Sequence, residues 1–318
     1  MKSSLSSTVV TEDQWSQLRR AFGDQLQSNV PLARYTAARL GGPAEGLLVV
    51  DTVPALARVV KTMWSLEIPF IVLGGGSNVL VSDAGLKGVV VLNRAKEIRV
   101  DSASATVWAA SGASFGKMAR KVSSLGWSGL EWATGIPGTV GGAVFGNAGA
   151  HGGEVADRLV MADILHRKRG EESWFPADLE FTYRSSVLKR EGIPAVILAA
   201  NFKLERKPQK EIEARIERFT ARRKSTQPPG ASMGSMFKNP PGNFAGRLID
   251  AAGLKGTRLG GAEISPLHGN FFVNTGEATA MDVYRLIRLV QEKVYKSSGV
   301  LLELEIELLG EFDLSDEQ

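Results

Sequence analysis

A glycine-rich segment, residues 135–153, most constrains how this chain can fold. It places eight glycines in nineteen residues, more than a helix interior or a central strand accepts without a reason. A backbone without side chains can approach a bulky ligand closely, and this segment has few charged neighbours. Main-chain N–H and C=O groups would then hold the ligand, which suits the phosphates and ring edges of a nucleotide. The alternative is a set of tight turns that binds nothing.

A second glycine element follows the apolar run of residues 69–73. Residues 74–78 read Gly-Gly-Gly-Ser-Asn, and the apolar pattern resumes at Val79. A buried strand that ends in a glycine turn is a common way to present N–H groups to phosphates. The spacing does not fit the dinucleotide fingerprint, because Val79 follows instead of a third glycine. Residues 112–118 do not fit a P-loop, since Met118 replaces the Ser or Thr that would hold Mg²⁺. The sequence predicts a nucleotide site built from two separate glycine loops.

Seven motifs, in order, resemble the UDP-N-acetylenolpyruvoylglucosamine reductase (MurB) family. Three resemble its FAD-binding half: residues 36–44 (TAARLGGPA), 72–81 (VLGGGSNVLV) and 135–143 (GIPGTVGGA). Four resemble its substrate half: residues 183–189 (YRSSVLK), 234–240 (GSMFKNP), 245–256 (AGRLIDAAGLKG) and 305–310 (EIELLG). The resemblance spans roughly residues 35–310. It implies an α+β fold class, a two-subdomain FAD-binding fold of the vanillyl-alcohol-oxidase/p-cresol-methylhydroxylase type plus a C-terminal α+β substrate domain.

The resemblance also implies a flavin-mediated reduction. NADPH would give a hydride to FAD, and the flavin would pass it to C3 of UDP-N-acetylglucosamine enolpyruvate, forming UDP-N-acetylmuramate for peptidoglycan. The FAD would be non-covalent, because the chain has no cysteine and its three histidines lie in no recognised attachment motif. The residues expected to bind the cofactor are Gly74, Gly75, Gly76, Ser77, Asn78, Gly135, Gly138, Gly141, Gly142 and Asn147.

Three residues match the family's catalytic positions. Hydride addition at C3 leaves negative charge at C2 and its carboxylate, so the site needs a cation and a proton donor. The family match implies that Arg184 stabilises this charge, that Ser235 protonates C2, and that Glu305 orients the substrate or relays protons. Without the resemblance, Arg184 reads as a surface charge and Ser235 as a turn residue. Glu305 then reads as part of the solvated face of a strand over residues 302–308, where Leu or Ile alternates with Glu.

Contacts with the UDP-linked amino sugar are expected around two basic segments. Residues 222–228 and the pair Lys238 and Asn239 offer charges of the right sign for a diphosphate. The residues expected to bind substrate are Tyr183, Arg222, Lys238 and Asn239. Only 51 positions separate Arg184 from Ser235, which leaves little room for an inserted substrate lid. The chain therefore resembles the family's shorter, second type.

Composition and charge argue against several classes of binding partner. The 318-residue chain has a net charge of +4, but its basic residues are interspersed with acidic ones, so no nucleic acid is expected. The three histidines are far apart and no cysteine is present, so no metal site is expected. No apolar run approaches the length of a membrane span, and we expect no membrane association and a cytoplasmic location. The oligomeric state stays open, with a monomer compatible.

We expect five parts along the chain: an N-terminal extension (1–30), FAD-binding subdomain 1 (31–92), FAD-binding subdomain 2 (93–205), a substrate-binding domain (206–300), and a C-terminal strand returning to the active site with a tail (301–318). Local signals predict a helix at 12–22, a strand–helix–strand unit from 47 to 73 with parallel pairing, and a hairpin at 97–110. Thr52 is expected to cap the helix of that unit, and further helices are expected at 115–125, at 206–224 and after the Thr279 capping box. In the helix at 206–224, Ile212, Ile216 and Phe219 give only a narrow apolar stripe.

Two other functions remain open at this point. One is another FAD-dependent oxidoreductase of the same fold that acts on a hydroxylated small molecule. The other is a non-catalytic nucleotide-binding module, which would require Arg184, Ser235 and Glu305 to be dispensable.

Overall fold

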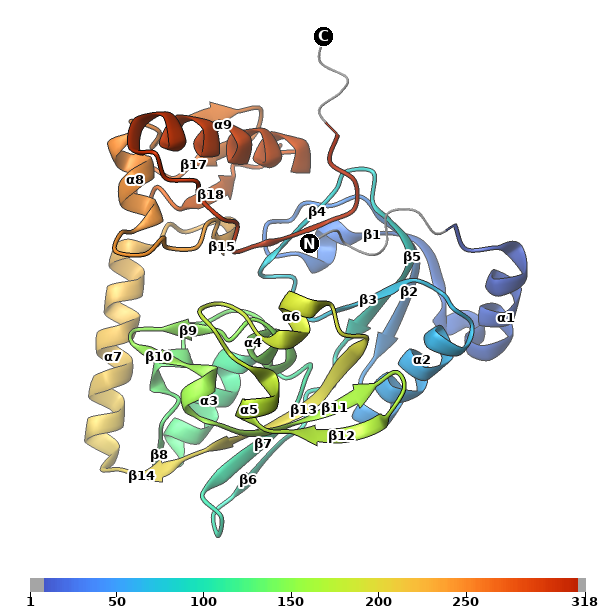
Figure 1. Ribbon diagram of the computed structural model, residues 1–318. Helices are drawn as coiled ribbons and strands as arrows, with labels where there is room; N and C mark the ends of the chain where they lie inside the picture. Colours follow the sequence, from blue (N-terminus) through green and yellow to red (C-terminus); the bar gives the residue numbers. More distant parts are fainter. Residues whose placement is uncertain (1–8, 314–318) are drawn as a thin grey trace. The chain divides into compact units, whose positions relative to one another are not determined.

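The computed structural model describes residues 9–313, which form two compact units (Figure 1). The first unit contains Leu48–Gly75 and Val91–Arg223. The second contains the described residues up to Leu47, Gly76–Val90, and the described residues from Lys224 onward. Each unit thus combines segments that are distant in sequence. The five-part division expected above stays a prediction.

The first unit is built on a five-stranded antiparallel sheet with the order β12-β11-β13-β7-β6. The strands are β6 (Ile98–Asp101), β7 (Thr106–Ala110), β11 (Leu159–His166), β12 (Gly170–Trp174) and β13 (Ala195–Lys203). The expected hairpin is confirmed, because β6 pairs antiparallel with β7 across a short turn. Phe115 and Phe202 are fully buried and pack with Trp132 in the core of this unit.

Helices and short strands complete this unit. They are α2 (Val53–Ser65), α3 (Phe115–Ser124), α4 (Val140–Phe145), α5 (Pro176–Leu179), α6 (Val187–Glu191), α7 (Gln209–Thr226, which belongs to this unit as far as Arg223), β8 (Trp127–Ser128), β9 (Gly149–Ala150), β10 (Gly153–Glu154), β14 (Glu205–Arg206), and the 3-10 turns η3 (Glu131–Ala133) and η4 (Val155–Asp157). As expected, Thr52 caps α2 by accepting a hydrogen bond from the Ala55 N–H at 3.2 Å. The narrow apolar stripe expected for α7 is also confirmed, since Ile212 is its only buried residue.

A four-stranded sheet has the order β1-β2-β5-β3. Its strands are β1 (Gln27–Pro31), β2 (Pro43–Val50), β3 (Phe70–Leu73) and β5 (Leu86–Asn93). The strand–helix–strand elements are confirmed, but β5 lies between β2 and β3, so their direct parallel pairing was wrong. The reason is burial: Val89, Val90, Val91 and Leu92 are nearly inaccessible to solvent. Such a continuous apolar run suits an interior strand.

The second unit contains an antiparallel sheet with the order β15-β18-β17-β16 and three helices. These elements are β15 (Ala231–Ser235), β16 (Arg258–Leu259), β17 (Ala262–Ile264), β18 (Phe271–Asn274), α1 (Glu12–Phe22), α8 (Ala245–Ala251) and α9 (Ala280–Ser298), with 3-10 turns η1 (Gly23–Gln25) and η2 (Leu32–Tyr35). Helix α1 has the expected bounds and buries Trp15, Leu18 and Phe22. The Thr279 capping box at the start of α9 is present as expected.

The predicted strand over residues 302–308 was wrong. Only β19 (Glu307–Leu309) is regular, and it pairs in parallel with β4 (Val79–Val81). Leu304 instead forms an isolated bridge with Phe237, and the chain bends at residues 305–306. The backbone bends because it changes pairing partners there. Glu305 consequently lies half-buried at the bend and not on a continuous solvated face.

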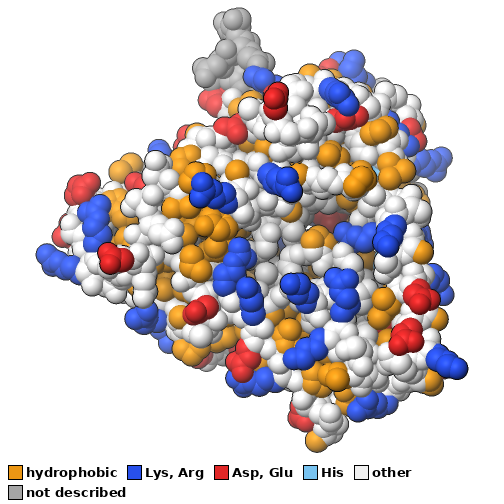
Figure 2. All heavy atoms as spheres, turned by 180° about the vertical axis from the view of Figure 1, so that it is seen from behind, with side chains coloured by type: hydrophobic (Ala, Val, Ile, Leu, Met, Phe, Trp, Pro, Cys, Tyr) orange, Lys and Arg blue, Asp and Glu red, His pale blue; other side chains and the backbone are white. Residues whose placement is uncertain are grey.

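Charged side chains are spread over the surface. Figure 2 shows lysines and arginines interspersed with acidic and hydrophobic side chains on one face. Within residues 9–313, no helix combines the length and hydrophobicity that a membrane span requires. The same part of the chain contains no group of three or more His, Asp or Glu side chains that could hold a metal ion.

Candidate flavin site and catalytic residues

Two glycine loops lie side by side in the first unit. A Cβ atom on Gly74 would lie 2.3 Å from Oγ1 of Thr139, and one on Gly75 would lie 3.0 Å from Cα of Gly138. Gly138 also has a φ of 97°, in the region that favours glycine. Side chains at Gly74 or Gly75 would push the loops apart. The structure therefore brings together the two elements that the sequence predicted as one nucleotide site.

Gly142 leaves open space in front of the backbone. This exposed residue lies inside α4, and a Cβ atom there would meet only Oγ1 of Thr139, at 3.7 Å. Its neighbour Gly141 differs, because a Cβ there would lie 2.9 Å from Cβ of Ser111. Packing accounts for the glycine at 141 but not for the glycine at 142. A bare backbone facing open space fits a phosphate or ring edge of FAD.

The end of the first glycine loop belongs to the second unit. Gly76 has a φ of 58°, and a Cβ there would lie 2.1 Å from the Tyr35 carbonyl oxygen. Ser77 is half-buried. The Asn78 side-chain amide donates to the main-chain oxygen of Glu305 at 3.0 Å. The structure thus joins an expected cofactor residue, Asn78, to an expected catalytic residue.

The basic stretch on α7 reaches the second glycine loop. A Cβ atom on Gly135 would lie 2.9 Å from Cδ of Arg223, so the arginine stem packs over this glycine. Burial lowers the pKa of Arg223 below its usual value. Arg222, the expected substrate contact, is exposed. Arg223 is therefore a partly desolvated cation beside the loop, a feature that sequence reasoning did not separate from its neighbours.

His151, at the tip of the β9–β10 hairpin, is a residue that sequence reasoning missed. Its ring stacks on Phe219 of α7, with centroids 4.5 Å apart and planes 9° apart. Partial burial lowers the pKa of His151, and the positive charges of Arg222, Arg223 and Arg218 lower it further. The stack joins the hairpin to α7, and burial together with the nearby arginines favours the neutral imidazole.

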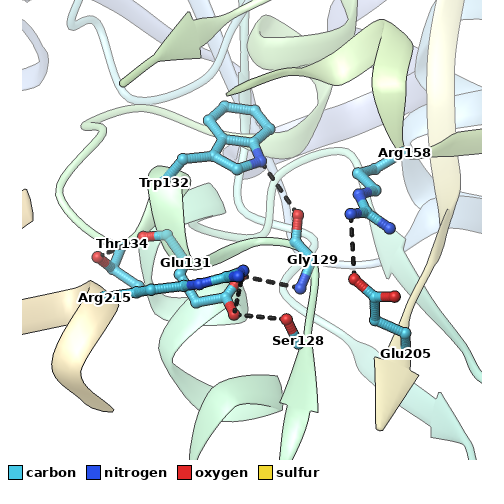
Figure 3. A network of polar contacts seen from close by, with 8 residues as sticks. All are labelled: Ser128, Gly129, Glu131, Trp132, Thr134, Arg158, Glu205 and Arg215. Atoms are coloured by element: carbon cyan, nitrogen blue, oxygen red, sulfur yellow. Dashed lines mark hydrogen bonds and ion pairs between the residues drawn. The ribbon is translucent and has the colours of Figure 1, made fainter. Parts of the chain in front are cut away.

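A buried carboxylate anchors the turn before the second loop (Figure 3). Glu131 accepts hydrogen bonds from the Ser128 hydroxyl at 2.6 Å and the Gly129 N–H at 2.8 Å. Arg215 of α7 lies 3.9 Å from the same carboxylate, whose side chain is 4% exposed. Thr134 donates to the Glu131 carbonyl at 2.9 Å. Glu131 therefore fixes the start of the loop and its connection to α7.

Arg184 occupies the corner of a tight turn. Thr182 and Ser185 exchange two main-chain hydrogen bonds of 3.0 and 3.1 Å, and Arg184 has a φ of 54°. Turns usually place glycine or asparagine in this left-handed conformation, so arginine is held there at a cost. Its guanidinium lies 5.0 Å from the centroid of the Tyr183 ring and donates to the Gly149 carbonyl. This geometry holds the half-buried guanidinium of Arg184 in one orientation. A surface charge without a function would not need such a constraint.

Asn147 connects the glycine segment to that turn. It is fully buried with a φ of 45°. Its side-chain amide donates to the Thr182 carbonyl at 3.0 Å and accepts from the Ala156 N–H at 3.0 Å. The structure therefore shows Asn147 holding the Arg184 turn, and its contact with the cofactor stays a prediction.

Ser235 and Glu305 lie on neighbouring segments of the second unit. Ser235 ends β15 opposite Phe271, directly after Gly234, which has a φ of 77°. The Glu305 N–H donates to the Met236 carbonyl at 2.9 Å. Glu305 is therefore hydrogen-bonded to the residue that directly follows Ser235 in the chain.

The expected substrate residues next to Ser235 have partners within the protein. The Lys238 ammonium lies 3.5 Å from the exposed carboxylate of Glu303. The Asn239 side chain is exposed and accepts from the Ala245 N–H at 3.0 Å, at the start of α8. Both remain near the surface.

Two family models match different parts of this chain. Residues 44–174 match the family model of an FAD binding domain, and residues 225–309 match that of the UDP-N-acetylenolpyruvoylglucosamine reductase C-terminal domain. The α+β fold class, with its FAD-binding fold and a C-terminal substrate domain, is confirmed.

Relatives that match over most of this chain are reductases of the same name. UDP-N-acetylenolpyruvoylglucosamine reductase of Chloroflexus aggregans is 43% identical over 291 residues, covering 89% of this chain and 97% of the relative. The Rubrobacter xylanophilus protein of the same name is 45% identical over 282 residues, covering 88% and 94%. The crystal structure of the reductase from Thermus caldophilus superposes with a TM-score of 0.77 at 39% identity, covering 89% of this chain and 99% of that one. This chain belongs to the UDP-N-acetylenolpyruvoylglucosamine reductase (MurB) family.

Proposed function

We propose that this chain reduces UDP-N-acetylglucosamine enolpyruvate to UDP-N-acetylmuramate for peptidoglycan, with FAD as cofactor and NADPH as reductant, in the cytoplasm. The observation that carries the proposal is the 43% identity to a reductase over 97% of that relative's length. A different flavin oxidoreductase of the same fold would leave the match of residues 225–309 to the reductase C-terminal domain unexplained.

Arg184 supplies the fixed positive charge of the reaction. Bound FAD supplies hydride transfer from NADPH to C3 of the enolpyruvyl group. The guanidinium of Arg184 binds the enolpyruvyl carboxylate and stabilises the negative charge that develops at C2. Because arginine stays protonated, it does not compete for the proton that C2 needs. The left-handed turn and the contact with Tyr183 hold the guanidinium in place before the charge forms.

Ser235 supplies the proton to C2 from its hydroxyl. A serine hydroxyl is a weak acid, so it can donate only to a strongly basic carbon held close to it. Glu305, half-buried at the bend, orients the enolpyruvyl group or returns a proton to the serine. The Met236–Glu305 hydrogen bond supports the pair, because it ties the two backbones together.

The UDP part of the substrate is held by cations and polar groups near the surface. Arg222 and Lys238 have the charge to bind the diphosphate, while Tyr183 and Asn239 are exposed and offer hydrogen bonds and a ring face to the sugars or the base. The experiment is turnover of the purified protein with NADPH and UDP-N-acetylglucosamine enolpyruvate, followed by mass spectrometry. The proposal predicts a product heavier by two hydrogen atoms, formed one-to-one with NADPH consumed. NADPH consumption without this product would contradict it.

A further inference from the structure

Asn270 is a buried side chain that completes the backbone pairing next to Ser235. It is 3% exposed and precedes β18. Its side-chain oxygen accepts from the Phe237 N–H at 2.9 Å, and its side-chain amide donates to the Phe237 carbonyl at 2.8 Å. Its main-chain oxygen also accepts from the Met236 N–H at 2.9 Å. One residue therefore holds three main-chain groups of two consecutive residues.

At this point the Asn270 side chain makes the hydrogen bonds that a neighbouring strand would otherwise make. The pairing of β15 with β18 ends at Ser235 and Phe271, because the chain turns there and the Phe271 N–H donates to the His268 carbonyl. The Asn270 amide then continues the ladder by one residue. Phe237 is fully buried, so water is not available to replace the amide, and unpaired main-chain groups there would be costly.

The opposite edge of the same segment holds Glu305. The Met236 carbonyl accepts from the Glu305 N–H at 2.9 Å, and the Lys238 N–H donates to the Glu303 carbonyl at 2.8 Å. Residues 236–238 thus connect Ser235 on one side with Glu305 on the other. Any twist of this segment would move the two catalytic candidates relative to each other.

We propose that Asn270 is a positioning residue for substrate reduction: its amide clamps Phe237 and thereby sets the relative placement of Ser235 and Glu305. The inference rests on the proposed function. It assigns Asn270 no contact with substrate or cofactor. The half-reaction with NADPH should therefore not depend on Asn270.

Asn270→Asp tests the clamp with almost no change in shape. An ionised carboxylate still offers one oxygen as acceptor for the Phe237 N–H. Its second oxygen, however, faces the Phe237 carbonyl oxygen, and two acceptors repel each other. A protonated carboxyl can donate to that carbonyl again, and burial raises the pKa of the introduced group. Reoxidation of the reduced flavin by the enolpyruvyl substrate should be slower by about 10²-fold when the group is ionised, because small displacements of catalytic groups have effects of this size. The loss should recover between roughly pH 8 and roughly pH 5.5, while reduction by NADPH stays at the parent rate.

The parent rate, measured at each pH, corrects for the other titratable or charged groups nearby. These are His268, Lys238, Glu303 and Glu305. A second readout is amide hydrogen exchange, which should become faster at Lys238 and Glu305 in Asn270→Asp at the higher pH. Asn270→Gln keeps donor and acceptor but displaces them, so it should slow reoxidation without recovery at low pH. This variant also serves if Asn270→Asp fails to fold.

Asn274→Asp is the matched control at the other end of β18. Its amide likewise donates to a main-chain carbonyl, that of Ala38 at 3.0 Å, and its oxygen accepts from the Gly276 N–H at 2.8 Å. This control should reoxidise at the parent rate. The inference is overturned if Asn270→Asp reoxidises like the parent at both pH values, if both half-reactions slow equally, or if the control slows as much. Failure of the parent to be reoxidised would instead contradict the proposed function.

Discussion

The glycine loops of the first unit and the Ser235–Lys238 segment of the second prepare a site in opposite ways. At Gly75 the missing side chain lets the backbones of the two loops meet, and at Gly142 it leaves open space beside the backbone. Around Ser235 a buried side chain is added to hold a backbone segment that carries functional groups. A cofactor that is the same in every turnover can be held by main-chain groups, whereas the chemical step needs side chains at defined positions.

Each of the two regions contains a buried asparagine that holds a main-chain segment in place. Asn147 in the first unit and Asn270 in the second are buried, and each amide accepts from one main-chain N–H and donates to one main-chain carbonyl. Asn147 holds the turn that carries Arg184, and Asn270 holds the segment that follows Ser235. The comparison implies that substitutions in the glycine loops change flavin content, while those at the catalytic candidates change only substrate reduction.

Ser235→Ala should separate the half-reactions most strongly. Flavin reduction by NADPH should stay intact, while reoxidation by the enolpyruvyl substrate should slow by about 10² to 10⁴-fold, the usual contribution of general acid catalysis. Ser235→Cys should recover part of the loss because a thiol can deliver a proton. Stopped-flow absorbance of the flavin follows both steps. Reoxidation of Ser235→Ala at the parent rate would remove Ser235 as the donor and favour Glu305 or a bound water.

Arg184→Gly should lower function without lowering stability. Loss of the cation should slow reoxidation by about 10² to 10³-fold, as for other groups that stabilise a developing anion. Glycine suits the left-handed φ, and relief of about 1 kcal/mol offsets the lost contacts with Tyr183 and Gly149. Thermal melts and stopped-flow measure the two effects. The control is Glu180→Gly, at another left-handed residue with a φ of 43°, which should leave both half-reactions unchanged. A large drop in melting temperature for Arg184→Gly would mean that Arg184 is structural.

Gly142→Val should weaken flavin binding while the apoprotein keeps its stability. The φ of Gly142 lies outside the left-handed region and a Cβ there would meet only Thr139, so the backbone accepts a side chain at this position. Overpacking against FAD should cost about 1–3 kcal/mol, or roughly 5- to 150-fold in affinity. Titration of apoprotein with FAD gives the affinity, and thermal melts give the stability.

Gly146→Ala, at the C-terminal end of the same helix, is the control for Gly142→Val. A Cβ there would lie in ordinary contact, 3.5 Å from the Gly142 carbonyl oxygen. If Gly142→Val binds FAD like the parent protein, the loop is a structural turn and the cofactor site has been misplaced.

His151→Phe should have the smallest effect, on the pH dependence of stability. Because the folded pKa of His151 is lowered, its contribution to stability is present above the unfolded pKa of about 6.5 and is lost as the pH falls toward the folded value. Phenylalanine keeps the stack on Phe219 and cannot be protonated, so the variant should lose less stability on acidification. Thermal melts from neutral to acidic pH measure this. Some dependence should remain, because burial also lowers the pKa of His268. Equal acid sensitivity in variant and parent would show that the stack does not titrate.

Local signals in the sequence predicted much of the fold. The caps at Thr52 and Thr279 and the bounds of α1 depend on neighbouring residues, so they were readable. The insertion of β5 between β2 and β3 and the bend at Glu305 depend on pairing with distant segments, which periodicity does not encode. The alternation of Leu and Glu is compatible with a straight strand until a partner strand interrupts it.

The candidate site divides in the same way. The glycine loops stood out by composition, but Arg184, Ser235 and Glu305 were chosen through the family resemblance, since each has an ordinary role in its own segment. Asn270 and Glu131 could not be found from sequence. An isolated asparagine or glutamate next to a glycine or tryptophan reads as a turn or surface residue, and only burial with main-chain partners reveals its task.

The central claim is that an enolpyruvyl sugar nucleotide is the oxidant of the reduced flavin. The direct test is anaerobic stopped-flow mixing of the NADPH-reduced parent protein with UDP-N-acetylglucosamine enolpyruvate, compared with UDP-N-acetylglucosamine, which lacks the enolpyruvyl group. The account predicts that the oxidised flavin band returns in one turnover with the first compound only. A flavin that stays reduced with both compounds, or that is reoxidised by both alike, would contradict it.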